Sequence, residues 1–252
     1  MSQYFNLTRF GRLFSKHTAE HALSYGMGMA VLFGGILLVM GFLTYLQGSP
    51  PSLGGQSVFF TLFLLAAGFF FTSLALNQFS ERRQAALALM LPASQGEKYV
   101  VAWLYSLPIF LVVYTAVFYA ADWLVLHLMG QQEAPPMFNV FTRDTLDILG
   151  VYLVVHSLAL WGSIFYQRLQ FVKAAFAAFL ALVLLGLVNY QVLKSFVGSD
   201  LVFTVPLSTV RFRDGSALVL PDAQEHWLAL LPLALTALLW LAAYARLTEK
   251  QL

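Results

Sequence analysis

The chain contains no cysteine and few charged residues. None of its 252 residues is a cysteine, which excludes disulfides, thiolate metal sites and cysteine nucleophiles. Asp, Glu, Lys and Arg make up only 10% of the chain, against about 25% in an average soluble domain. Hydrophobic residues make up 60%, more than a water-soluble globule of this length can cover. The composition therefore excludes an ordinary soluble domain and favours a protein embedded in lipid.

Other absences narrow the range of functions. The sequence has no Gly-x-x-x-x-Gly-Lys-Ser/Thr motif, so it lacks the standard loop that binds nucleotide phosphates. The five histidines are scattered, and we expect no close pair of metal ligands among them. A formal net charge of +2 gives no reason to expect a nucleic-acid partner. We therefore predict a protein that is not an enzyme and has no catalytic residues, metal site or cofactor of its own.

Six apolar runs are long enough to cross a membrane. The hydrocarbon core of a bilayer is about 30 Å thick, and a helix needs roughly 20 apolar residues to span it. The runs lie at residues 25–46, 57–77, 99–121, 148–166, 171–190 and 227–245. The predicted fold is an all-α integral membrane protein in which residues 25–252 form a transmembrane domain of six helices.

A segment of mixed polarity, residues 1–24, precedes the first run. Its apolar residues recur at helical spacing and its basic residues fall on other faces; they are Leu7, Phe10, Leu13 and Phe14, and Arg9, Arg12 and Lys16. This pattern is typical of an amphipathic helix that lies flat at the membrane surface. We therefore predict an N-terminal cytoplasmic interfacial helix.

The positions of the basic residues predict the orientation of the chain. Lys and Arg near the ends of spans favour the cytoplasmic side. With the N-terminus inside, ten of the 14 basic residues lie inside: Arg9, Arg12, Lys16, Arg82, Arg83, Lys98, Arg168, Lys173, Arg246 and Lys250. The four outside are Arg143, Lys194, Arg211 and Arg213. Both termini are therefore predicted to be cytoplasmic.

Two longer segments fall on the outside in this orientation. In residues 122–147, Asp122 and His127 are expected on a solvated helix face rather than in a metal site. In residues 191–226, Asp214 and Gly215 lie between two β-prone runs, a pattern that favours a hairpin. We therefore predict a small extracytoplasmic segment of strand and turn between the fifth and sixth helices.

The loop between the second and third runs, residues 78–99, has the sequence QFSERRQAALALMLPASQGEKY. Ser80 can cap a helix in which Gln84, Leu87 and Leu91 recur at spacings of three and four residues, and Pro92 ends it. This predicts an amphipathic helix at about residues 80–91 on the cytoplasmic face. Pattern alone leaves two roles open: binding a partner, or anchoring the loop on lipid phosphates.

This loop resembles the cytoplasmic coupling segment between the second and third helices of ABC-2-type transporter permeases. The resemblance is carried by ERR at its start and by LMLPASQGEKY before the next span. The leader NLTRFGRLFSKHTAEH is similar to the N-terminal interfacial helix of a bacterial branch of that family. Six spans with both termini inside also match the family's transmembrane domain.

The resemblance implies a membrane subunit of an ATP-binding cassette transporter, an exporter in the bacterial inner membrane. Two permease copies or paralogues would form a pair, and separate ATPase subunits would bind ATP-Mg and drive transport through the coupling helix. The residues that would contact the ATPase are Glu81, Arg82, Arg83, Gln84, Leu87, Met90 and Leu91. Family members often carry short re-entrant helices between the last two spans, so residues 191–226 form either these or the hairpin. A non-transporting membrane scaffold that recruits a cytoplasmic partner is the alternative function.

His156 is the only ionisable residue well inside a predicted span. Transporters driven by protons or sodium ions normally keep carboxylates near the membrane centre, and none is expected there in this chain. His156 is therefore either a contact in a transport pathway or a hydrogen-bonded packing residue between helices. Pro108, in the third span, is expected to kink that helix or mark its bend.

Small residues recur at four-residue spacing on two of the predicted spans. They are Gly26, Ala30 and Gly34 in the first span, and Ala174 and Ala178 in the fifth. Such faces allow close approach of another helix. That helix belongs either to a second permease or to the same chain.

Overall fold

The computed structural model describes residues 5–76, 93–129, 136–166, 170–197, 210–212, 217–218 and 222–249. Six helices in these ranges are long and apolar enough to cross a membrane: Leu7–Gln47, Leu53–Ala75, Gln95–Leu128, Thr145–Phe165, Phe171–Phe196 and Leu230–Glu249. Each contains one of the six predicted apolar runs or most of it. The prediction of a multi-pass helical membrane protein is confirmed.

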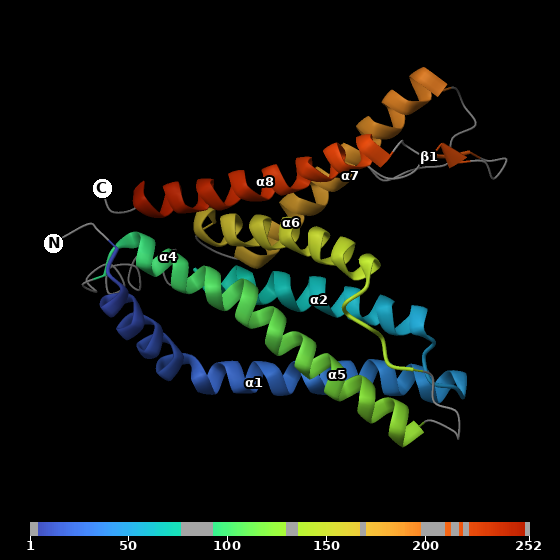
Figure 1. The fold of residues 1–252 in the computed structure, drawn as a ribbon, viewed down its shortest axis with the longest axis horizontal. Coiled ribbons are helices and arrows are strands. Elements are labelled where there is room, and N and C mark those ends of the chain that lie inside the picture. Colours follow the sequence, from blue (N-terminus) through green and yellow to red (C-terminus); the bar gives the residue numbers. More distant parts are fainter. Residues whose placement is uncertain are drawn as a thin grey trace.

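The helices form one bundle (Figure 1). The elements are α1 (Leu7–Gln47), α2 (Leu53–Ala75), α4 (Gln95–Leu104), η2 (Tyr105–Ile109), α5 (Phe110–Met129), α6 (Arg143–Phe165), α7 (Gln170–Val197) and α8 (Asp222–Glu249). Helix α6 packs against α2, α8 and α7, whereas α1 packs mainly against α5. The beginnings of α1 and α4 and the end of α8 lie at the same end of the bundle.

Helix α1 is a single helix of 41 residues. The side chain of Asn6 caps its start, and Gly48, with φ 68°, ends it in the left-handed conformation that glycine adopts most easily. The boundary predicted at residue 24 is not a break in the helix, although Figure 1 shows that its first turns bend away from the rest. At 1.5 Å per residue α1 is about 60 Å long, twice the thickness of a bilayer core. Part of α1 must therefore extend beyond the membrane.

The third span contains a π-helical turn at the position where proline was expected to bend it. Helices α4 and α5 are joined by the π-helical turn η2, which contains Pro108. Proline cannot donate a hydrogen bond to the preceding turn, and a π-turn accommodates the missing bond without ending the helix. The polypeptide therefore continues as one long rod from Gln95 to Met129 with a local widening at Tyr105–Ile109.

Two short strands lie between α7 and α8. β1 (Val210–Arg211) pairs with β2 (Ala217–Leu218) in antiparallel register, with Val210 opposite Leu218. Most of the remaining residues between Val197 and Asp222 lie outside the described ranges, so the predicted strand-and-turn segment as a whole stays a prediction. Figure 1 places the paired strands at the end of the bundle opposite to the start of α1.

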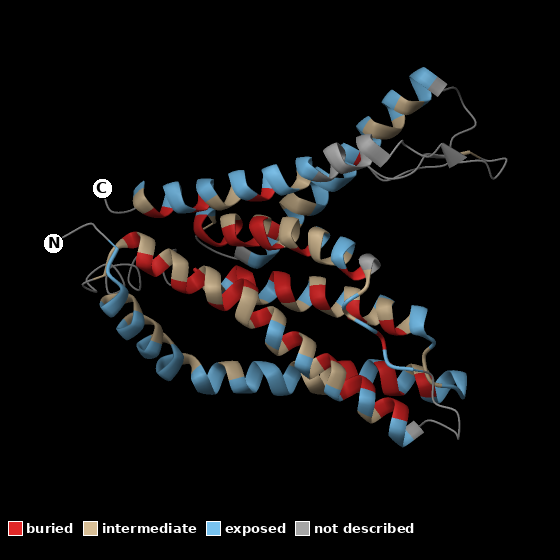
Figure 2. Ribbon diagram, viewed as in Figure 1, coloured by how far each residue is buried: buried red, intermediate tan, exposed pale blue. Residues whose placement is uncertain are grey.

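The core lies where α1, α2, α5 and α6 meet. It contains Ile36, Met40, Phe60, Tyr114 and Tyr152, all fully or almost fully buried. Figure 2 shows that α7 and the first part of α1 are mostly exposed, which a bilayer would cover.

Two glycines allow helices to approach closely. A Cβ at Gly68 would come 2.3 Å from a ring carbon of Tyr152, and one at Gly162 would come 2.5 Å from the Cβ of Ala174. These positions lie between α2 and α6 and between α6 and α7. Because neither residue has a side chain, α2 and α7 can both pack closely against α6.

Candidate functional site

The residues predicted to contact an ATPase all lie outside the described residues. They are Glu81, Arg82, Arg83, Gln84, Leu87, Met90 and Leu91. The end of the same loop is described from residue 93 onward. The geometry at that end shows how the loop returns to the helical bundle.

Ser94 and Glu97 begin α4 with a capping box. The backbone N–H of Glu97 donates to Ser94 Oγ at 3.2 Å, and the backbone N–H of Ser94 donates to Glu97 Oε2 at 2.9 Å. These bonds satisfy two backbone donors that a helix start otherwise leaves without partners. Local sequence alone, Ser-x-x-Glu, therefore determines where the loop ends.

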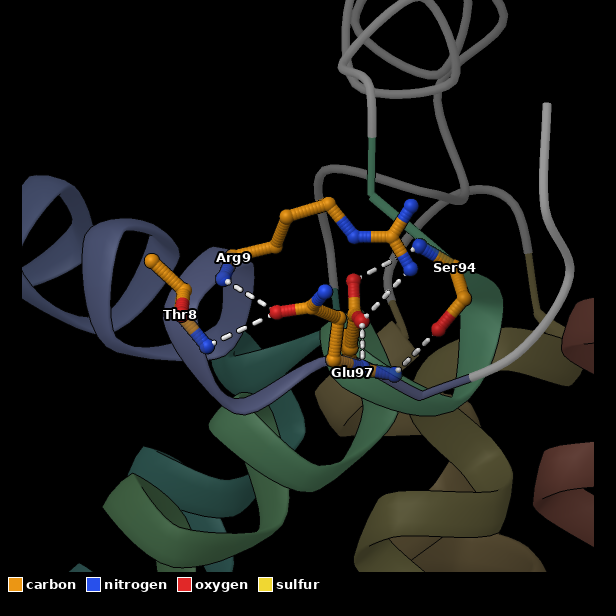
Figure 3. Close-up of polar contacts among 5 residues, drawn as sticks. Thr8, Arg9, Ser94 and Glu97 are labelled. Atoms are coloured by element: carbon orange, nitrogen blue, oxygen red, sulfur yellow. Dashed lines mark hydrogen bonds and ion pairs between the residues drawn. The ribbon is translucent and has the colours of Figure 1, made fainter.

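The same glutamate also binds the beginning of the chain (Figure 3). Glu97 Oε1 accepts a hydrogen bond from the backbone N–H of Asn6 at 2.8 Å and one from Arg9 Nη2 at 3.0 Å. The Asn6 side chain caps α1 by accepting from the N–H groups of Thr8 and Arg9. We call Asn6, Arg9, Ser94 and Glu97 the Glu97 network.

Burial makes the Glu97 network stronger than a surface ion pair. The side chain of Glu97 is 0% exposed and that of Arg9 is 28% exposed. A buried carboxylate that loses its partners costs far more free energy than an exposed one, because no water replaces them. The start of α1 and the end of the loop of residues 78–99 are therefore held together as one unit.

A second set of contacts joins α1 to the third span further along, at η2. The ring of Tyr105 lies 5.0 Å from that of Phe14, 4.6 Å from that of His17 and 5.5 Å from that of Tyr25, measured between centroids. The hydroxyl groups of Thr18 and Tyr105 are also hydrogen-bonded. The leader is thus fixed to the third span at two levels, α4 and η2.

Two of the five histidines, His17 and His21, lie close together, although their contacts are with protein groups. The rings of His17 and His21 stack at 4.4 Å between centroids. Their spacing of four residues places them on one helix face, and that signal was available in the sequence. His17 Nε2 is hydrogen-bonded to the hydroxyl of Tyr25, and His21 Nδ1 to the carbonyl of His17. Among the described residues, no group of three or more side chains can hold a metal ion.

His156 lies buried between three elements. Trp240 Nε1 of α8 donates to His156 Nδ1 at 3.2 Å, and His156 Nε2 lies 2.9 Å from Ser106 Oγ in η2. Because an indole N–H only donates, Nδ1 is the acceptor and the ring proton lies on Nε2. Nε2–H then donates to Ser106, whose hydroxyl donates to the carbonyl of Trp103.

Both nitrogens of His156 are thus occupied by partners from other helices. A second proton on the ring would place two N–H groups head to head at Trp240, so protonation requires this contact to break. The geometry places His156 as a link between α6, α8 and the π-turn. It leaves neither nitrogen open to a passing substrate in this conformation.

Comparison with known proteins provides no closer assignment. No family model, no curated protein and no solved structure matches the chain. The fold itself identifies the class of protein: it is a multi-pass helical membrane protein. The family resemblance therefore depends on the motifs in the sequence alone.

Proposed function

We propose that this protein is the membrane-spanning permease subunit of an ATP-binding cassette exporter. Separate ATPase subunits bind and hydrolyse ATP, and the predicted coupling helix at about residues 80–91 passes the resulting movement to the six spans. The observation that carries the proposal is the Glu97 network at the end of that loop. It gives the loop a rigid connection to both the first and the third spans.

The mechanism follows from this connection. A force applied to the predicted coupling helix is passed directly to Glu97. Ser94 caps α4 shortly after Pro92, so no long flexible segment lies between them. Through Asn6 and Arg9 the same displacement reaches α1, and through η2 it reaches α5. Coupling between two sites requires such an element, whose position both sites influence.

A pair of permeases fits the exposed face of α1. Added Cβ atoms at Gly26 and Gly34 meet nothing within 4 Å in the described part of the chain, so these glycines serve no close contact there. Ala174, in contrast, packs against Gly162 of the same chain. Of the two small-residue faces, the one on α1 is therefore the candidate for contact with a second permease.

The experiment reverses two charges in the predicted coupling helix. Arg82→Glu together with Arg83→Glu should reduce co-purification of the ATP-binding cassette subunit encoded nearest to this chain by at least about tenfold, or 1.4 kcal/mol. Membrane insertion should be unchanged, because both residues lie outside the six apolar runs of the sequence. Arg246→Glu with Lys250→Glu, on the same predicted side, serves as the control and should leave co-purification intact. Equal recovery with the Arg82/Arg83 variant would reject the interface.

A scaffold that only recruits a cytoplasmic partner would give the same co-purification result. The two functions separate when the complex is reconstituted in lipid vesicles. A transporter should show ATPase turnover that changes with a transported molecule. A scaffold should show constant turnover across a panel of lipids and amphipathic compounds.

A further inference from the structure

Asp122 is a fully buried carboxyl group in the third span. Helix α5 continues to Met129 and includes Asp122, but Asp122 lies on a buried face of this helix and not on the solvated face that the sequence predicts. It is 0% exposed, and neither of its carboxyl oxygens has a hydrogen-bond partner in the described part of the chain. It shares the buried face of α5 with Phe118, Ala121 and Val125, which follow helical spacing.

His127 does not pair with this aspartate. Its ring lies 4.5 Å from that of Trp123 between centroids, and its Nδ1 is hydrogen-bonded to the Trp123 carbonyl at 2.9 Å. Trp123 is 49% exposed, so this pair faces away from the core.

The elements packed against α5 offer no cation. The helical elements with most contacts to α5 are α1, α2 and η2. Residues 136–142 also contact α5 through Tyr119, and they contain no Asp, Glu, Lys, Arg or His. Residues 25–47 of α1 and all of α2 contain no Asp, Glu, Lys, Arg or His, and η2 has Tyr105 as its one titratable residue. Of the two tyrosines in residues 25–47, Tyr25 is hydrogen-bonded to His17 and Tyr45 is 78% exposed.

The phenols of α5 itself are also engaged elsewhere. Tyr114 donates to the carbonyl of Phe60, and Tyr119 donates to the carbonyl of Phe138. No described group therefore compensates a negative charge on Asp122.

We propose that Asp122 is a proton-binding site in the third span. A carboxylate without a partner in an apolar core is strongly disfavoured, whereas the neutral acid that forms when one proton binds to one oxygen is tolerated far better. The proton is held while Asp122 stays buried, and water that reaches its carboxyl group releases it. This inference does not rest on the proposed transport function.

Labelling of the unmodified protein tests the site directly. Dicyclohexylcarbodiimide is a lipophilic reagent that attacks protonated carboxyl groups. An ordinary exposed aspartate is protonated in only about one molecule in a thousand at pH 7. In the purified full-length protein, mass spectrometry should find Asp122 labelled at least about tenfold more than the exposed Asp147. Equal labelling, or no labelling at Asp122, overturns the proposal.

Stability provides an independent readout. Asp122→Asn keeps the shape of the neutral acid and cannot ionise. As pH rises from about 4 to 6, the unfolded wild-type chain loses the Asp122 proton while most of the folded chain keeps it. The folding equilibrium constant of the wild type should therefore fall relative to Asp122→Asn by up to about tenfold per pH unit. All other titratable groups are the same in the two proteins, so their contributions to the pH dependence cancel. A stability difference between the wild type and Asp122→Asn that stays constant with pH overturns the proposal.

Discussion

At the scale of single residues, Glu97 joins the start of α1 to the start of α4. It accepts from the backbone of Asn6 and of Ser94 and from the guanidinium of Arg9. The Ser-x-x-Glu spacing of Ser94 and Glu97 is a capping-box signal in the sequence, but the third span was predicted to begin only at residue 99. Arg9 was predicted only as a charge on an interfacial helix. Its pairing with a residue 88 positions away follows from packing and not from any local pattern.

Removing Glu97 should therefore destabilise the fold. Glu97→Ala leaves three donors without their acceptor in a buried place, and the free energy of unfolding should fall by about 2–4 kcal/mol. Glu97→Gln keeps an acceptor for the backbone and loses the charge, so about 1–2 kcal/mol is expected. The matched control is Glu249→Ala, whose ion pair with Arg246 is half exposed and should contribute less than about 1 kcal/mol. Denaturant titration of the purified variants measures all three, and an equal loss for Glu97→Ala and Glu249→Ala would contradict the assignment.

At the scale of elements, the position of α6 depends on Gly68 and Gly162, which let α2 and α7 pack closely against it. The π-turn η2 adds a second determinant, because it presents Ser106 to His156 and Tyr105 to the leader. The proline that marks this turn was visible in the sequence, whereas the partners of the turn were not. Which helix faces a small residue depends on how whole helices pack.

One glycine of α6 tests this packing. Gly162→Ala adds a Cβ 2.5 Å from the Cβ of Ala174, which is attached directly to the backbone of α7 and cannot turn aside. The helices must separate, and the free energy of unfolding should fall by about 1–3 kcal/mol. Gly150→Ala lies on the same helix with nothing within 4 Å and should stabilise it by about 0.5–1 kcal/mol. The double variant Gly162→Ala with Ala174→Gly should regain most of the loss, and failure to do so would show that the contact is not the cause.

At the scale of the whole molecule, the proposed function requires the loop of residues 78–99 to face the cytoplasm. The fold places the start of α1, the start of α4 and the end of α8 at one end of the bundle, while the side of the membrane comes from the distribution of basic residues (Figure 1).

Single cysteines can test this orientation without background, because the chain contains none. A cysteine at Ala85 should react with a membrane-impermeant thiol reagent in inverted vesicles and not in intact spheroplasts. A cysteine at Phe141, which is 94% exposed between α5 and α6, should show the opposite pattern. Reaction at position 85 from the outside would reject the topology and, with it, the role of the loop as a coupling segment.

The sequence by itself determined the six spans, because a bilayer requires about 20 apolar residues in each and every backbone group bonded within its own helix. Both requirements are local and can be found along the chain. Tertiary structure alone decided that Asp122 is buried, that His156 links α6 to α8 and η2, and that Glu97 binds the start of α1. Each of these depends on which helix faces lie against one another, and that is set by the packing of side chains from residues far apart in the sequence.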